Sequence, residues 1–323
     1  MKNQAKTNKK IVVIGGGTGV YTVLTALKPY FQNLTAIVTM ADDGGSTGIL
    51  REEFGILPPG DIRRALIALS ASNNRMLADL FSYRFEEGVG LTGHNFGNLL
   101  ITALHRITND FEAAINEAGK ILMVEGKVVP VTLRQAQLMA ELEDGQIITG
   151  ETNIDIPQHD GRLKIKRVWL KPQVNINPNA EKEILDADLI IIGPGDLYTS
   201  LIPNLLVKGL KEALQRTGGK VIYFVNLMTK FGETGNFAAS DFINTINLYL
   251  GDGVLDFAVI NNKRPAPQRL VAYVKERSEF VEPDLGNIRP SKDFMPLAAD
   301  VLRARGLVRH DLEKVAKVVK MLV

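Results

Sequence analysis

The sequence predicts an α/β fold with a mostly parallel sheet flanked by helices. Residues 11–14 are a short β-branched run that ends in glycines, and the segment after them keeps a helical periodicity up to Pro29. The apolar run of residues 34–40 barely alternates, as expected for a strand that is buried on both faces. Strand, helix and strand in this order make the βαβ unit of a parallel sheet.

A helical segment at about 61–119 and a β-rich insertion at about 121–172 are predicted to follow this unit. Asp61, directly after the turn "PPG", is the expected N-cap of the first helix in the segment. Beyond the insertion, buried strands at 188–192 and 220–225 again alternate with helical stretches. Two late strands, at 256–261 and 270–274, and an amphipathic C-terminal helix at 310–322 complete the expected elements.

No Pro/Gly-rich linker interrupts residues 11–323, so this range is expected to be a single elaborated α/β domain. The lysine-rich residues 1–10 are expected to be a disordered tail. The apolar run after this tail is too short for a signal peptide or a membrane span. We therefore predict a cytoplasmic protein without membrane insertion.

The composition excludes several classes of function. Lys and Arg number 38 and Asp and Glu 36, so a formal net charge of +2 gives no field that would favour nucleic acid as a partner. The chain has no cysteine, which excludes disulfides, thiolate nucleophiles and Cys-ligated zinc. A chain of 323 residues can bury a sizeable core without such covalent links.

Three polar or glycine-rich loops follow predicted strands. Residues 15–19, "GGGTG", lie between a strand and a helix, where backbone N–H groups and the helix dipole favour an anion. Because no lysine follows and the third fingerprint position is Val20, this is neither a P-loop nor a good dinucleotide fingerprint. Residues 193–200, "GPGDLYTS", repeat this arrangement, and Asn226 and Thr229 follow another strand. Either the loops converge on one phosphate-binding crevice, which we favour, or they are unrelated connections.

Asp42 and Asp43 follow the second predicted strand and precede "GGS". An acid in this place can bind a ribose hydroxyl, whereas paired carboxylates beside phosphate-binding turns can hold Mg²⁺. A solvated Asp-Asp turn is the third alternative. The glycines and Ser46 favour contact with a ligand, and Mg²⁺ at Asp42 and Asp43 is the metal site that we predict.

Two predicted helices contain residues that lower helix stability unless they contact another group. Arg63 and Arg64 fall in the first turn of a predicted helix, where the dipole disfavours cations, which hints at an anion or a nearby carboxylate. Gly97 and Asn98 lie inside an apolar helix, a choice that suggests close approach to another group. Asn95 is either a ligand contact or simply the N-cap of that helix. The four histidines show no metal-ligand spacing and are expected to be structural or exposed.

Taken together, these motifs closely resemble the bacterial gluconeogenesis factor family (YvcK-like), in the superfamily of 2-phospho-L-lactate transferase (CofD-like). The resemblance rests on "IVVIGGGTG", on the block from "AIVTMADDGGSTG" to "LPPGDIRRAL", and on "GHNFGNLL", "IIIGPGDLYTS" and "NLMTKFGETGNF". These motifs cover nearly the whole chain in the same order. The resemblance implies a Rossmann-like fold that binds a nucleotide diphosphate.

In the gluconeogenesis-factor branch, the resemblance implies a UDP-sugar ligand such as UDP-N-acetylglucosamine and a role in cell shape and wall synthesis during gluconeogenic growth. In the transferase branch it implies Mg²⁺-dependent transfer of a phospholactyl-type group. Whether the chain is a regulator or an enzyme stays open, as does the third reading of a dinucleotide-binding protein, and we expect no organic cofactor. Catalytic residues are unknown, and a homodimer is expected as one form.

The expected ligand contacts combine the loop motifs with two late positions, Tyr273 and Arg309, which the resemblance alone implies as UDP-sugar contacts. The full set is Gly15, Gly16, Gly17, Thr18, Gly19, Asp42, Asp43, Gly44, Gly45, Ser46, Asn95, Asn98, Gly193, Pro194, Gly195, Tyr198, Asn226, Thr229, Tyr273 and Arg309.

Overall fold

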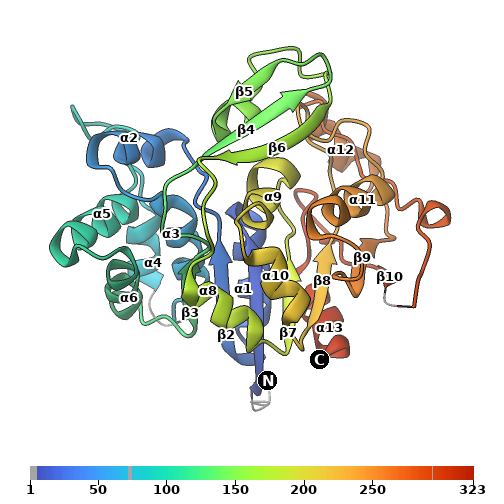
Figure 1. The fold of residues 1–323 in the computed structure, drawn as a ribbon, viewed down its shortest axis with the longest axis horizontal. Coiled ribbons are helices and arrows are strands. Elements are labelled where there is room, and N and C mark those ends of the chain that lie inside the picture. Colours follow the sequence, from blue (N-terminus) through green and yellow to red (C-terminus); the bar gives the residue numbers. More distant parts are fainter. Residues whose placement is uncertain (1–5, 72–74, 293) are drawn as a thin grey trace.

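The computed structural model describes residues 6–71, 75–292 and 294–323, and its centre is a seven-stranded parallel sheet (Figure 1). The strand order is β10-β9-β8-β7-β1-β2-β3. Its strands are β1 (Thr7–Gly15), β2 (Phe31–Val38), β3 (Lys127–Pro130), β7 (Leu189–Ile192), β8 (Lys220–Phe224), β9 (Phe257–Asn261) and β10 (Met295–Ala299). Residues 11–14 of β1 and all of β7 are buried, which confirms the predicted parallel α/β class.

Helices cover both faces of this sheet. On one face α1 packs against α3 and α13, and on the other α8, α9, α10 and α11 pack against one another (Figure 1). The helices of the structure are α1 (Gly17–Leu27), α2 (Gly45–Phe54), α3 (Pro59–Leu69), α4 (Arg75–Ser82), α5 (Phe96–Thr108), α6 (Phe111–Ile121), α7 (Glu151–Asp155), α8 (Pro178–Leu185), α9 (Ile202–Leu205), α10 (Leu210–Arg216), α11 (Ala239–Leu250), α12 (Pro267–Val274) and α13 (Leu312–Leu322).

The predicted helical segment corresponds to α3, α4, α5 and α6, which form the side of the molecule beyond β2 (Figure 1). The predicted insertion begins later than expected, because β3 pairs in parallel with β2 and is the edge strand of the large sheet. The separate unit is a three-stranded antiparallel sheet of β4 (Gln137–Leu142), β5 (Ile147–Thr149) and β6 (Ile165–Lys171). It lies above the carboxyl ends of the parallel strands (Figure 1).

Two further expectations are wrong. Residues 7–10 are not a tail, because they extend β1 and Lys9 and Lys10 form salt bridges with Asp188 and Asp186; residues 1–5 lie outside the described range. Residues 270–274 are not a strand, because they belong to α12. Pro267 starts that helix, and the side chains that turn inward are Leu270 and Tyr273, three residues apart.

Asp61 is not the N-cap of α3. Pro58 occupies that position, and Asp61 is a buried residue of the first helical turn. The C-terminal amphipathic helix, α13, forms as predicted and packs on α1.

Candidate functional site

The strand order places a crevice between β1 and β7. From β1 the chain winds outward toward β3, and from β7 it winds outward toward β10, so the loops after these two neighbours lead to opposite faces. Both glycine turns, residues 15–19 and 193–195, lie at this point. They touch each other: a Cβ on Gly19 would overlap the Pro194 carbonyl group, so the contact requires glycine.

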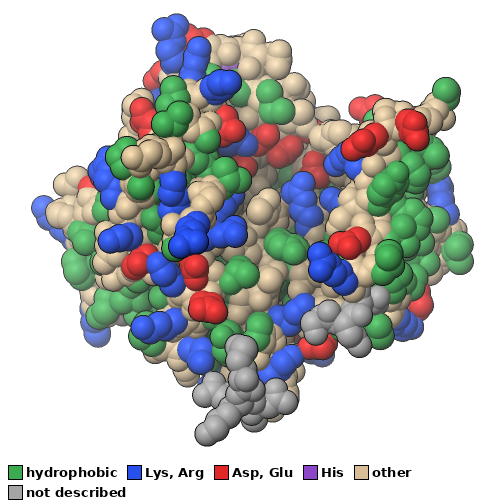
Figure 2. Space-filling model, turned by 180° about the vertical axis from the view of Figure 1, so that it is seen from behind, with side chains coloured by type: hydrophobic (Ala, Val, Ile, Leu, Met, Phe, Trp, Pro, Cys, Tyr) green, Lys and Arg blue, Asp and Glu red, His purple; other side chains and the backbone are tan. Residues whose placement is uncertain are grey.

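A cavity of about 850 Å³ opens at the crevice. Its walls come from the turns after β1, β2, β7 and β8, from α7 of the small sheet, and from the segment before α13. Figure 2 shows the molecule from behind, with acidic and basic side chains close together around a hollow. The predicted residues that line the cavity are Gly16, Gly17, Thr18, Gly19, Asp42, Gly44, Gly45, Ser46, Asn98, Pro194, Gly195, Asn226, Thr229, Tyr273 and Arg309. The loops that we expected to converge therefore do so.

Four predicted residues support the walls from behind. Gly15 and Gly193 pack on Leu201 below the turns. Asn95 is the N-cap of α5 and accepts hydrogen bonds from the backbone N–H groups of residues 97 and 98. Tyr198 is buried, and its backbone N–H donates to Glu233. These contacts position the lining without reaching it.

Asp43 joins two parts of the fold. Its carboxylate accepts hydrogen bonds from the backbone N–H groups of Glu151 and Thr152 and from the Thr152 hydroxyl, at 2.8–3.1 Å. Asp43 is not among the described residues that line the cavity, whereas Asp42 is. The adjacent acids therefore have different roles, and Asp43 is already occupied in holding the first turn of α7.

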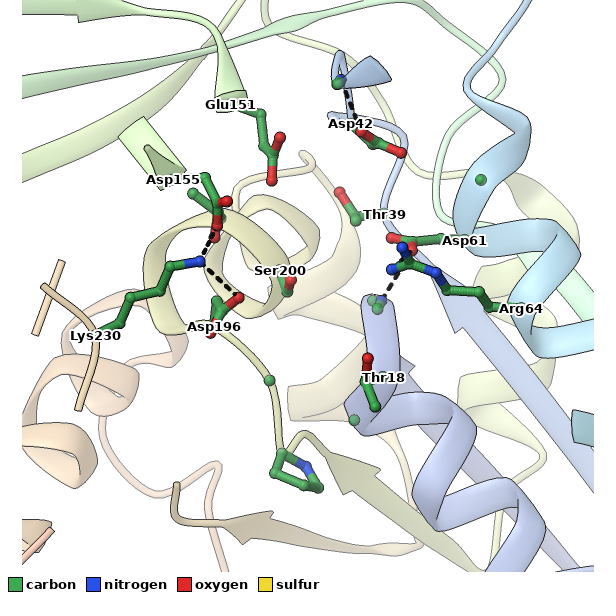
Figure 3. A pocket seen from close by; sticks show the side chains of 18 of the residues that line it. Thr18, Thr39, Asp42, Asp61, Arg64, Glu151, Asp155, Asp196, Ser200 and Lys230 are labelled. Atoms are coloured by element: carbon green, nitrogen blue, oxygen red, sulfur yellow. Dashed lines mark hydrogen bonds and ion pairs between the residues drawn. The ribbon is translucent and has the colours of Figure 1, made fainter. Parts of the chain in front are cut away.

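An internal carboxylate faces the first glycine turn. Asp61 Oδ1 accepts a hydrogen bond of 2.9 Å from the Gly17 N–H at the start of α1 (Figure 3). Burial, followed by the charge of Asp42, raises the pKa of Asp61 to about 6. The amide that we expected to bind a phosphate is thus paired with a carboxyl group of the protein.

Asp42 and Asp61 form the carboxylate pair of the cavity. The pKa of Asp42 is also raised, first by burial, and the two groups line the same wall (Figure 3). The nearest cation is Arg64, whose Nη1 lies 3.6 Å from Asp61 Oδ1. Two carboxyl groups that repel one another on one wall of the cavity suit a divalent cation such as Mg²⁺, which prefers oxygen ligands. The predicted pair of Asp42 and Asp43 fits a metal less well, because both Asp43 oxygens are engaged.

A second acidic group surrounds Lys230 on the opposite wall. Lys230 Nζ pairs with Asp155, lies 3.1 Å from Asp196 and lies 3.8 Å from the fully buried Glu233 (Figure 3). Oxygens of the three acids lie within 4.8 Å of one another, a spacing that a cation can bridge. In this structure the Lys230 ammonium is that cation. Burial raises the pKa of Glu233 to about 8, although Lys230 and the Thr199 hydroxyl oppose the shift.

Glu151 faces the cavity between these two groups (Figure 3). Burial, together with the charges of Asp42 and Asp155, raises its pKa to about 9. Near neutral pH this carboxyl group is therefore protonated and can donate a hydrogen bond.

The remaining walls are basic and aromatic. Tyr273 is buried on α12, and its hydroxyl accepts a 2.9 Å hydrogen bond from the Val308 N–H. Arg309 is exposed, and His310 is a buried histidine whose pKa burial lowers to about 4. Arg63 and Arg84 enter from the helical side. Burial, followed by the charges of Arg64 and Arg84, lowers the pKa of Arg63 to about 10.

Comparison with known proteins gives the family. The family model described as 2-phospho-L-lactate transferase CofD matches residues 11–302. The chain belongs to the CofD family. Among the relatives of this CofD-family chain, a Nostoc sp. protein is 47% identical over 96% of this chain and 67% of its own length. The Bacillus subtilis protein named "Gluconeogenesis factor" is 42% identical over 95% of this chain and 96% of its own length.

The solved structures agree. A crystal structure of a Bacillus halodurans protein matches this CofD-family chain with a TM-score of 0.92 and 40% identity, over 97% of this chain and 100% of that one. None of the helices within the described residues is long and apolar enough to cross a bilayer.

Sequence reasoning missed several lining residues of this CofD-family site. Glu151 and Asp155 lie on α7, the helix between β5 and β6 of the small sheet. Asp196 and Lys230 lie in loops of which the sequence analysis named other residues, among them Pro194, Gly195, Asn226 and Thr229. His310 was expected to be merely structural or exposed but lines the cavity. Glu151, Asp155 and His310 lie outside the quoted motifs, and Asp196 and Lys230 are common residue types inside two of them. Only the convergence of distant segments reveals their place in the site.

Proposed function

We propose that this protein is a gluconeogenesis factor whose cavity binds a UDP-sugar such as UDP-N-acetylglucosamine without turnover. In this proposal it serves cell shape and wall synthesis during growth on gluconeogenic carbon sources. The names of the relatives support the first part, since several carry the term gluconeogenesis factor. The observation that carries the ligand is that Tyr273 and Arg309 line the same cavity as the two glycine turns.

The chemistry of these residues suits a nucleotide diphosphate. Among the described residues, no carboxylate forms a salt bridge with Arg309, so its guanidinium is available for the bidentate contact that diphosphates favour. Tyr273 offers an aromatic edge at the same end. The Gly17 N–H is held by Asp61, and the other residues of the glycine turns that line the cavity offer further backbone amides. A cytoplasmic location and a homodimer stay predictions.

Calorimetric titration with UDP-N-acetylglucosamine tests the proposal. We expect binding at submillimolar concentration, and we expect Arg309→Ala to weaken it by about tenfold or more, because a charge-assisted contact to a phosphate is lost. Arg305→Ala is the matched control, since Arg305 is an exposed arginine in the same segment that does not line the cavity. Absence of any heat with the unaltered protein would refute UDP-sugar binding.

A second function is favoured by the Asp42–Asp61 pair. Two facing carboxyl groups could hold Mg²⁺, which supplies charge stabilisation in phosphoryl-group transfer of the phospholactate type. The same titration, repeated with GDP and with or without Mg²⁺, separates the two functions. Preference for GDP that depends on Mg²⁺ would favour the transferase over the UDP-sugar regulator.

A further inference from the structure

Arg63 carries a buried charge that forms no salt bridge with any acid in the described part of the chain. Arg63 is 8% exposed, and among the described residues its side chain makes one hydrogen bond, of 3.4 Å, to the Phe81 carbonyl oxygen. The Nε atom has no partner, and no described carboxylate lies within salt-bridge distance. A buried guanidinium is stable when an anion pairs with it, so this arrangement is incomplete without one.

The fold makes room for this side chain. Gly97, in the first turn of α5, has the Arg63 Cδ atom so close that a Cβ there would lie 2.8 Å from it. The same Cβ would lie 2.6 Å from the Phe81 carbonyl oxygen. A glycine in an apolar helix costs about 1 kcal/mol relative to alanine. Gly97 therefore makes α5 less stable than an alanine would, and it leaves space for the Arg63 side chain.

Neighbouring groups add to an anion-binding surface. Arg84 and Arg64 also line the cavity, and within residues 6–71, 75–292 and 294–323 the Arg84 side chain donates only to the Gly93 carbonyl oxygen. Asn98 donates to the Ser46 hydroxyl, while its Oδ1 atom is buried without a partner. An amide can exchange its two ends by rotation, so Asn98 can present its NH₂ group to an anion. The first turn of α2, with Ser46 and Thr47, has no acidic residue or side-chain cap.

This surface lies away from the end of the cavity that holds Tyr273 and Arg309. Arg63 follows β2, whereas Tyr273 follows β9, and β8, β7 and β1 lie between these strands. Four strand spacings correspond to roughly 19 Å. Arg309 precedes α13, and α13 and α3, the helix of Arg63, pack on α1 as separate neighbours. We therefore place an oxyanion at Arg63 apart from a phosphate at Arg309.

We propose that Arg63, Arg84 and Asn98 form a second subsite, which binds a phosphate or carboxylate group of a small molecule other than the nucleotide. The inference deepens the proposed function by adding a second ligand to the same cavity. It needs neither Tyr273 nor Arg309. The shared chemistry is a compact oxyanion, and separate titrations with inorganic phosphate and with acetate show which source the subsite prefers.

The test is calorimetric titration of the full chain with inorganic phosphate. We expect millimolar binding that Arg63→Met weakens by about tenfold or more and Arg84→Met by a few fold. Arg106→Met is the matched control: this arginine of the neighbouring α5 pairs with the Phe54 carbonyl oxygen and does not line the cavity. Saturation with UDP-N-acetylglucosamine should leave phosphate affinity within about twofold.

Three results would overturn the subsite: no phosphate binding to the unaltered protein, unchanged binding in Arg63→Met, or competition between phosphate and the UDP-sugar. Arg63→Met removes an unpaired buried charge, so it should keep its melting temperature in phosphate-free buffer. If this variant does not fold, the exposed Arg84→Met decides alone, and unchanged affinity there refutes the proposal. The titration with inorganic phosphate does not depend on Arg309, so its result is independent of whether the protein binds a UDP-sugar.

Discussion

Lys230 shows how one cation can organise a cavity wall. Burial alone lowers the pKa of its ammonium group, but Glu233, Asp196 and Asp155 together raise it well above the ordinary value. The Glu233 side chain is fully buried, and its oxygens also accept from the Tyr198 N–H and the Thr199 hydroxyl. Removing the cation would leave three acids facing each other with no counter-charge.

Lys230→Met should therefore lower the free energy of unfolding by about 2–4 kcal/mol at pH 7, because one partner of a buried charge cluster is lost. At pH 5 the loss should be smaller, since Glu233, whose pKa burial raises to about 8, is then fully protonated in the folded protein. Urea unfolding at both pH values measures the effect. Lys127→Met is the control, because Lys127 is an exposed partner of Glu183. Equal stability of the two variants at pH 7 would show that Lys230 is dispensable.

At the scale of single residues, the sequence predicted well where a residue type was unusual for its context. Gly97 and Asn98 stood out inside an apolar helix, and the structure explains the glycine by the Phe81 carbonyl oxygen and the Arg63 side chain, which leave no room for a Cβ. Arg63 and Arg64 stood out at a helix start, and both line the cavity. Glu151 did not stand out, because an acid after a short strand is ordinary, and its environment arises only in three dimensions.

The connection between the small sheet and the large one depends on Asp43. Its carboxylate takes three hydrogen bonds from Glu151 and Thr152 at the start of α7, while Asp42 beside it faces the cavity. This connection holds Glu151 over the cavity. The DDGG loop is therefore a joint between two elements as well as part of the candidate site.

Asp43→Ala should lower the free energy of unfolding by about 1–3 kcal/mol, because partly buried N–H donors of α7 lose their acceptor. Chemical denaturation of the variant and of Asp144→Ala measures the difference. Asp144 is a suitable control, since it makes one local hydrogen bond, to the Gln146 N–H, in the exposed β4–β5 turn. A loss no greater than that of the control would mean that α7 is held by other contacts.

At the scale of elements, periodicity predicted buried strands better than it predicted their place in a sheet. The unbroken apolar runs of β1, β2 and β7 are strands of the parallel sheet, as expected. β3 was assigned to the insertion because a short run does not reveal its partner, which is β2. The strand predicted at residues 270–274 is wrong because the helical period of 3.6 residues and the strand period of two look alike over five residues. Pro267, in the first turn of α12, is the signal that indicates a helix.

For the whole molecule, the near-neutral net charge conceals a strongly uneven distribution. The formal charge is +2, yet six acids line the cavity and a seventh, Glu233, lies behind its wall. The six are Asp42, Asp61, Glu151, Asp155, Asp196 and Glu276. The pKa of Asp61 and of Glu151 is raised by burial and by these neighbours. A sequence-level charge count averages over the surface and cannot reveal this local field.

The stability of the ligand-free protein should consequently fall as the pH rises from 5 to 9. A carboxyl group whose pKa is higher in the folded than in the unfolded protein stabilises the fold while it is protonated, and this contribution is lost as the pH approaches the folded pKa, about 9 for Glu151. Glu151→Gln stays neutral, so it should flatten the decline by on the order of 1–3 kcal/mol after allowance for solvent screening. Denaturation of both proteins across this range measures the slopes, with Glu53→Gln, an exposed residue of α2, as the control. Parallel curves for the unaltered protein and Glu151→Gln would show that Glu151 ionises normally and that the acidic cavity does not set the pH dependence.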